Sequence, residues 1–293
     1  MVNSDITIRL LDWSGLRSDI ALLATLQHAD QAEVRRWLKQ PNLTPDQECV
    51  FAEVGGQAVG FGYLIVEQAL SRGVLIAEAE TPRVFSALIA EAVGRAQDAG
   101  LNALQIDVPE SDQQRHQACQ AAGMSIVRTH HHMVRPGAEP TGAALPPGTT
   151  TRLATRADVG AVTRIQNASF TGSWGYSPNS EGEIEYRVFE LPSLAPDAVV
   201  IVNVDGRDIG YCWTHQERTD APGIVGMVGV VPSQQGKGFG KLATAVGIDY
   251  LMSVGAARVE ITVDSENAPA IHVYESLGFK LHHRSVWYQR ELG

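Results

Sequence analysis

A glycine-rich turn is the stretch whose residue types point most directly to chemistry. It follows a β-branched run that ends at Pro232, and it leads into a helical pattern. Its members are Gln235, Gly236, Lys237, Gly238, Phe239, Gly240 and Lys241. Glycine lets the backbone approach a ligand closely, and the first N–H groups of a helix lie at the positive end of its dipole. With two lysines in an acidic chain, this stretch predicts a site for a phosphate or pyrophosphate.

Two familiar phosphate motifs fit this turn poorly. The Walker pattern needs glycine, four residues and then Gly-Lys-Ser/Thr, but Gln235 stands at the first glycine position and Leu242 at the last. The dinucleotide fingerprint needs Gly-x-Gly-x-x-Gly, whereas the spacing here is Gly-x-Gly-x-Gly. A nucleotide-binding protein that uses this loop for ATP is therefore disfavoured.

The turn instead fits Gln/Arg-x-x-Gly-x-Gly/Ala, and it resembles the pyrophosphate loop of the GCN5-related N-acetyltransferase (GNAT) family. A later string fits that family's Asn-x-x-Ala-x-x-x-Tyr-x-x-x-Gly-Phe motif, with Asn267, Ala270 and Tyr274 before Gly278-Phe279. The resemblance covers residues 150–293. It implies transfer of an acetyl group from acetyl-CoA to the amine of a small molecule or peptide, with no metal.

The resemblance also assigns roles to individual residues. The loop from Gln235 to Lys241 would anchor the pyrophosphate, and Asn267 would hydrogen-bond the cofactor arm. The strand before the loop would pair with that arm through Val228, Gly229 and Val230. Tyr274 would protonate the departing thiolate, because a phenol with a pKa of about 10 is protonated at neutral pH. Tyr274 also shares a helix face with apolar residues, so a purely structural tyrosine is the alternative.

A general base is harder to assign. Related tandem enzymes are expected to carry a carboxylate on the strand before the loop, but Ile224 stands at that position. Glu217, His215 and Asp264 are substitute candidates, and each also fits a solvated or structural role. The missing carboxylate keeps a second function open, in which the protein is a catalytically weak acyl-CoA sensor or a partner-binding protein.

The elements that must position these residues occur twice. A Pro/Gly-rich linker, 136–148, separates residues 1–135 from 149–293. The hairpin at 54–63 matches the one at 204–211, and Ala121–Met124 matches Ser276–Phe279. Two matches in the same order indicate a duplicated domain. The fold class predicted for each half is α/β with a mixed sheet, and the tandem arrangement resembles the mycothiol synthase family.

The second half is predicted to contain strands at 149–154, 198–204, 208–216, 223–231, 258–263 and 280–290. Its helices are predicted at 158–170, 181–190, 240–254 and 266–277. The first half repeats this order, with helices near 17–38, 82–98 and 112–121. Its loop position, 77–83, has no glycine, and no tyrosine lies between Ser111 and Gly123. The first half is therefore predicted to be a degenerate copy without catalysis.

Composition narrows the possible partners. The net charge of −10 is spread over both halves, which disfavours nucleic acid as a partner. No apolar run is long enough to span a membrane, and the start has no secretory pattern. Three distant cysteines predict reduced, buried thiols, and the run His130–His132 fits a strand better than a metal site. A cytoplasmic protein is expected, either a monomer or a homodimer.

Overall fold

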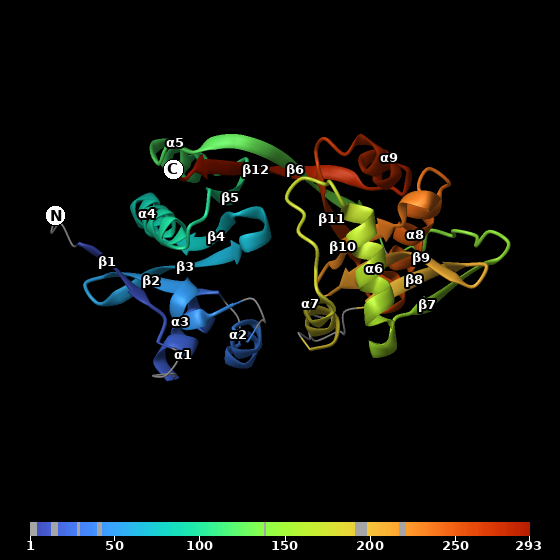
Figure 1. Cartoon of the computed structure of the whole chain (residues 1–293), viewed down its shortest axis with the longest axis horizontal. Helices are drawn as coiled ribbons and strands as arrows, with labels where there is room; N and C mark the ends of the chain where they lie inside the picture. Colours follow the sequence, from blue (N-terminus) through green and yellow to red (C-terminus); the bar gives the residue numbers. More distant parts are fainter. Residues whose placement is uncertain are drawn as a thin grey trace. The chain divides into compact units, whose positions relative to one another are not determined.

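The computed structural model describes residues 5–12, 17–27, 30–39, 43–137, 139–190, 198–216 and 221–293. The chain forms two compact units. The first unit contains Met1–Thr129 together with Ser285–Gly293, and the second contains His130–Arg284. Each unit has a sheet with helices on both of its faces (Figure 1).

The sheet of the second unit is mixed, with strands in the order β6-β11-β10-β9-β8-β7. The pairing of β10 with β11 is parallel, and the pairings on either side of it are antiparallel. The strands are β6 (Ser125–Pro136), β7 (Thr149–Leu153), β8 (Ala198–Val204), β9 (Arg207–His215), β10 (Gly223–Val230) and β11 (Arg258–Asp264).

Side-chain alternation along these strands divides the second unit into two faces. The α6 face packs Val199, Ile201 and Tyr211 against α6 (Val159–Phe170) and α7 (Glu181–Glu185), which continues as a π-helical turn to Glu190. The α8 face packs buried residues such as Cys212 and Val225 against α8 (Phe239–Ser253) and α9 (Ala268–Ser276). The functional elements are thus fixed by a core on each side of one sheet.

The first unit repeats this architecture around strands in the order β1-β2-β3-β4-β5-β12. The strands are β1 (Ile6–Leu10), β2 (Cys49–Val54), β3 (Gln57–Glu67), β4 (Arg72–Ala79), β5 (Ala103–Pro109) and β12 (Lys280–Glu291). Its helices are α1 (Arg17–Leu26), α2 (Gln31–Trp37), α3 (Pro45–Glu48), α4 (Pro82–Asp98) and α5 (Gln113–Ala121). Buried residues of α1 and α2 contact one face of the sheet, and those of α4 and α5 contact the other.

The two sequence repeats exchange their last strands. Residues 130–136 of β6 pair with β11 in the second unit, and residues 285–291 of β12 pair with β5 in the first unit. The compact units therefore differ from the repeats 1–135 and 149–293 by one strand segment each. Beyond Pro136, the described part of the linker 136–148 has no helix or strand. Thr141 attaches it to α8, because its N–H and hydroxyl donate to the Asp249 carboxylate at 2.6 and 2.9 Å.

The predicted α/β class with mixed sheets is confirmed, as are buried, free Cys49, Cys119 and Cys212. One predicted element is wrong: the single helix over 17–38 is two helices, α1 and α2. Aspartate is favoured at the start of a helix. Asp30 lies just before α2, and its carbonyl accepts a hydrogen bond from the Val34 amide at 3.1 Å. Within the described ranges, no helix has the length and apolar character needed to cross a membrane.

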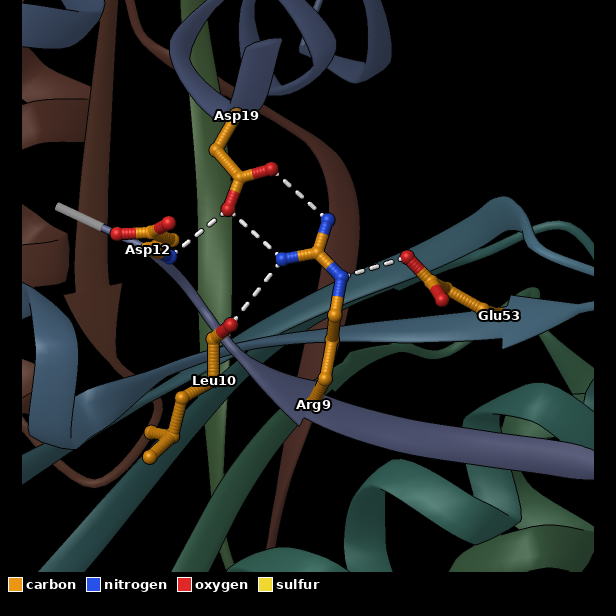
Figure 2. A network of polar contacts seen from close by, with 5 residues as sticks. All are labelled: Arg9, Leu10, Asp12, Asp19 and Glu53. Carbon is orange, nitrogen blue, oxygen red and sulfur yellow. Dashed lines mark hydrogen bonds and ion pairs between the residues drawn. The ribbon is translucent and has the colours of Figure 1, made fainter. Parts of the chain in front are cut away.

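A charged network anchors the first unit's leading strand (Figure 2). The Arg9 guanidinium donates to both carboxylate oxygens of Asp19, at 2.7 and 2.8 Å, and to Glu53 at 2.6 Å. The Asp12 amide donates to Asp19 at 2.8 Å. Burial alone would raise the pKa of Asp19, but the Arg9 and Asp12 hydrogen bonds outweigh it and lower that pKa. The network therefore joins β1, β2 and the start of α1 through the Arg9 guanidinium.

We expect Asp19→Asn to reduce the free energy of unfolding by about 1.5–3 kcal/mol at pH 7, the range for hydrogen bonds to charged groups. Because the folded pKa is lowered, this stabilisation is complete above the unfolded pKa of about 3.9 and is lost as the pH falls through the folded pKa. Thermal unfolding of parent and variant at neutral and acidic pH measures it. The exposed Asp98→Asn is the control, expected within about 0.5 kcal/mol of the parent. A parent–variant difference that does not shrink in acid would contradict this account.

Candidate functional site

The second unit's sheet divides between β10 and β11. These strands pair over Gly223–Val225 and Val259–Ile261, where Ile224 lies opposite Glu260. A β-bulge at Gly226 follows, and from Met227 to Val230 the printed pairing of β10 is with β9. In this described stretch, alternate N–H and C=O groups of β10 thus face the gap without a β11 partner. Such an edge can accept an extended chain as an added strand.

The glycine-rich turn lies at the far end of this open edge. Gly236 and Gly238 have φ values of +74° and +87°, in the left-handed region that favours glycine. Gly238 is the N-cap of α8, so it offers no side chain to the first N–H groups of the helix. Gln235 joins the loop to the end of β10, because its Nε2 donates a hydrogen bond to the Val230 carbonyl at 2.9 Å. Added Cβ atoms at Gly236, Gly238 and Gly240 would meet open space.

Positive charge accompanies these N–H groups. Lys237 and Lys241 are both exposed beside the first turn of α8. The Lys237 ammonium donates to the Ser233 carbonyl and the Gln234 side chain, each at 3.0 Å. Loop glycines, a helix N-terminus and two lysines together make an anion-binding arrangement.

The α6 face holds the open strand close to its neighbour. A Cβ at Gly229 would lie 2.6 Å from a ring carbon of Tyr211 and 3.0 Å from the Ser169 hydroxyl. The Tyr211 hydroxyl is hydrogen-bonded to Gln166 of α6 at 3.2 Å. Glycine at position 229 therefore lets α6 pack directly on the strand that forms one side of the gap.

Tyr274 and Asn267 belong to α9, on the α8 face. Tyr274 is partly buried among apolar residues and packs edge-on against Phe279, with ring centroids 5.9 Å apart. Burial, with the Cys212 thiol nearby, raises the pKa of Tyr274 well above its usual value, so its phenol stays protonated at neutral pH. Asn267 is the N-cap of α9, and its Oδ1 accepts the Ala270 amide at 3.2 Å. Its structural role is thus as a helix cap, and any contact with a ligand remains a prediction.

The α6 face carries a cavity of about 220 Å³ beside the gap. Its polar lining comes from β6, β11 and β12, namely His132, Glu260, Thr262, His282 and His283. The rings of His132 and His283 are stacked with centroids 4.2 Å apart, and His132 Nδ1 is hydrogen-bonded to the Thr262 hydroxyl at 3.1 Å. Neither Glu260 nor Thr262 was predicted from the sequence to be a site residue. The alternation of β11, with Val259, Ile261 and Val263 buried, was the available signal.

The loop 171–180 folds back on α6 toward the same face. Asn167 organises it, because its Oδ1 accepts the Tyr176 hydroxyl and the Asn179 amide, and its Nδ2 donates to the Asn179 carbonyl at 3.0 Å. Trp174 from this loop contacts His130 edge-on, with ring centroids 6.1 Å apart. The loop therefore reaches the strand that contributes His132 to the cavity.

The three substitute bases have different positions. His215 lies opposite Ile224 on the α6 face. Asp264 is at the end of β11 opposite His130 and accepts the Glu266 amide at 2.9 Å, so it holds the turn into α9. Glu217 falls outside the described residues. Among the described residues, no three His, Cys, Asp or Glu side chains gather as metal ligands.

The first unit lacks the anion-binding part of this arrangement. Its β4 and β5 pair in parallel over Arg72–Val74 and Ala103–Gln105, as β10 and β11 do. However, the Thr81 hydroxyl caps α4 by accepting the Val84 amide at 3.3 Å. The penultimate residue of the adjoining strand β4 is Glu78, which is paired with Arg115 at 2.9 Å. A threonine cap and acidic side chains occupy the place of the glycine loop.

The tyrosine position differs as well. Gly278 and Gly123 are 155 residues apart, and the same offset relates Tyr274 to Cys119. Cys119 is fully buried, and burial raises its pKa to about 12. The first unit thus has a protonated, enclosed thiol where the second has its tyrosine.

Both halves of the chain match family models of the same kind. The model described as "Acetyltransferase (GNAT) family" matches residues 160–279, and the one described as "Acetyltransferase (GNAT) domain" matches residues 29–144. The chain is a tandem GNAT protein. The family resemblance predicted from the glycine loop and the tyrosine motif is therefore confirmed, and it extends to the first half.

Among relatives, this GNAT chain is similar to the mycothiol acetyltransferase of Streptomyces avermitilis, at 31% identity over 60% of this chain and 58% of that one. The enzyme of the same name from Tsukamurella paurometabola is 35% identical over 57% and 60%. The matches thus span about three fifths of the length of these curated relatives.

Solved structures support the tandem fold over the full chain. A tandem GNAT protein from the clavulanic acid biosynthesis pathway has a TM-score of 0.77 at 17% identity, covering 99% of both chains. A GCN5-related N-acetyltransferase from Sphaerobacter thermophilus has a TM-score of 0.72 at 19% identity, covering 98% and 96%. At these identities the likeness is one of fold.

Proposed function

We propose that this GNAT protein transfers the acetyl group of acetyl-CoA to the amine of a small molecule or peptide, with the chemistry in the second unit. The observation that carries the proposal is the conjunction, in one unit, of an anion-binding helix start with an open strand edge. The first unit repeats the strand arrangement but has a capped helix start. The similarity to mycothiol acetyltransferases supports a small-molecule acceptor.

Acetyl-CoA would bind first to the anion-binding start of α8 and then along the open edge of β10. The N–H groups from Gln235 to Lys241 would hold the pyrophosphate, and the lysines would add to its charge neutralisation. The pantetheine arm would then run along β10 as an added strand, past Val230, Gly229 and Val228. Asn267 would reach the arm through its side-chain amide while its Oδ1 caps α9.

The reaction needs a polarised carbonyl and a stabilised leaving group. N–H groups on the open edge of β10 are fixed in place by pairing with β9, so they can stabilise the developing oxyanion without reorganising. Tyr274 would give its proton to the departing thiolate. Its raised pKa keeps the phenol protonated, which is the form that a general acid requires.

A panel of amines, assayed for CoA release and for the mass of the acetylated product, tests this function. Acetyl transfer to at least one class of amine is expected. Binding of acetyl-CoA with no turnover on any amine would instead favour the alternative, an acyl-CoA sensor. A cytoplasmic location and a monomeric or homodimeric state remain predictions.

We expect Gly240→Leu to separate ligand binding from folding. Gly240 lies in a helix and has open space at its Cβ, so leucine, a better helix former than glycine, should stabilise the fold by about 0.4–1 kcal/mol. Its side chain, larger than the alanine that the family motif allows at this position, should also hinder the close approach of the pyrophosphate and weaken acetyl-CoA binding about tenfold, or about 1.4 kcal/mol. Calorimetric titration and thermal unfolding measure the two effects.

The matched control is Gly94→Leu in α4, where the glycine also has open space at its Cβ. It should stabilise the fold by a similar amount and leave acetyl-CoA affinity unchanged. Equal affinity in the parent and Gly240→Leu proteins would show that the loop does not approach the donor.

We expect Tyr274→Phe to lower kcat about 10²-fold with unchanged acetyl-CoA affinity, because the ring is kept and the proton donor is lost. Steady-state kinetics with an amine that the parent acetylates measures this effect, and Tyr250→Phe in α8 is the control for loss of a phenol. A kcat within about twofold of the parent, at unchanged KM, would limit Tyr274 to packing.

A further inference from the structure

We propose that Glu260 is the base that removes a proton from the acceptor's ammonium group, and that the cavity beside it receives the acceptor. This role rests on the proposed acetyl transfer. An alkylammonium has a pKa of about 10.4 by analogy with lysine, so it is protonated at neutral pH. Its nitrogen has no lone pair for attack until that proton is removed, and a positioned base accelerates the step.

Glu260 lies at the level where the sheet divides. It is opposite Ile224 in the short parallel pairing, one residue before Ile261, at which that pairing ends. A donor arm entering from the glycine-rich end of the gap runs toward this point, so its acyl end would approach the closed end of the gap. The cavity lined by Glu260 therefore lies where the acyl group would stop.

The proposed acid and base lie on opposite faces of the sheet. Glu260 projects on the α6 face with Thr262, whereas Tyr274 belongs to α9 on the α8 face. An acceptor in the cavity and a thiolate near Tyr274 would meet at the gap between β10 and β11. Separation by the sheet prevents direct proton exchange between the carboxylate and the phenol, so each can act on its own reactant.

The surroundings of Glu260 hold its carboxylate in position. Arg258, two residues earlier on β11, forms an ion pair from its Nε to Glu260 Oε1 at 2.9 Å. The other titratable groups on this face or around the cavity are His130 and His132 on β6, Asp264 on β11, His282 and His283 on β12, and His215 on β9. The stacked imidazoles of His132 and His283 form one wall of the cavity.

The competing groups are less well placed. The Asp264 carboxylate accepts a hydrogen bond from the Glu266 amide, so it already stabilises the turn into α9. His215 on β9 and Glu260 on β11 lie on either side of Ile224 in the intervening strand β10. However, His215 does not line the cavity. Glu260 is the carboxylate among the residues that line the cavity.

In the proposed transfer, the ammonium nitrogen loses two protons. Glu260 accepts one proton from R–NH₃⁺, and the freed lone pair forms a C–N bond with the acetyl carbon. The C–S bond breaks with its electron pair on sulfur, and Tyr274 gives its proton to that thiolate. The second nitrogen proton reaches the Tyr274 phenolate through solvent, and Glu260 returns its proton to water. The products are the acetylated amine, CoA thiol and one proton.

The test is Glu260→Gln in the whole protein, with an amine that the parent acetylates. We expect kcat/KM for the amine to fall about 10²-fold at pH 7, with acetyl-CoA affinity unchanged. Without the base, the rate should be proportional to the concentration of unprotonated amine, so it should rise about tenfold per pH unit from pH 7 to 9. Adding Ile224→Glu to Glu260→Gln returns a carboxylate to the opposite position and should restore much of the activity.

Glu139→Gln, at an exposed glutamate of the linker, is the control for loss of a carboxylate, and it should keep activity within about twofold of the parent. An unchanged pH–rate profile in Glu260→Gln would overturn the role of Glu260. The same is true if His215→Gln, rather than Glu260→Gln, removes the activity. If the parent acetylates no amine while binding acetyl-CoA, the transferase function itself fails, and the role of Glu260 fails with it.

Discussion

The separation of β10 from β11 after Val225 and Ile261 is the constraint on which the rest of the second unit depends. A sheet normally satisfies the backbone groups of a central strand on both sides, and this one leaves a central edge open. The bulge at Gly226 and the tight packing of Gly229 against Tyr211 hold that edge in position. Because of the gap, side chains from the α6 face and from the α8 face can reach the same place in the sheet.

Duplication followed by divergence explains how the two units differ. Both keep a short parallel pairing and a helix that follows the divided strand. The first unit closes its helix start with the Thr81 hydroxyl and has Cys119 at the tyrosine position. Its core and the Arg9–Asp19 network are intact, so the fold has been kept while the anion-binding features are missing.

Much of the architecture could be predicted from the sequence because local signals were strong. Gly236 and Gly238 adopt left-handed conformations that other residues resist, and the predicted strands and helices of the second half are present. The exchange of β6 and β12 could not be predicted, because alternation specifies the faces of a strand and not its neighbour. For the same reason His132, Glu260 and His283 could not be brought together from sequence: they come from three strands, and β6 belongs to the other sequence repeat. The break between α1 and α2 was missed because apolar spacing continues across it.

We propose that the chain has one donor site, in the second unit. Calorimetric titration of acetyl-CoA into the whole protein tests it most directly, because it counts sites without requiring a known acceptor. One acetyl-CoA per chain is expected. The heat of binding should be lost in the Gly238→Glu variant, which has a side chain and a negative charge at the start of α8. Two equivalent sites per chain, or one site that is unaffected by Gly238→Glu, would contradict it.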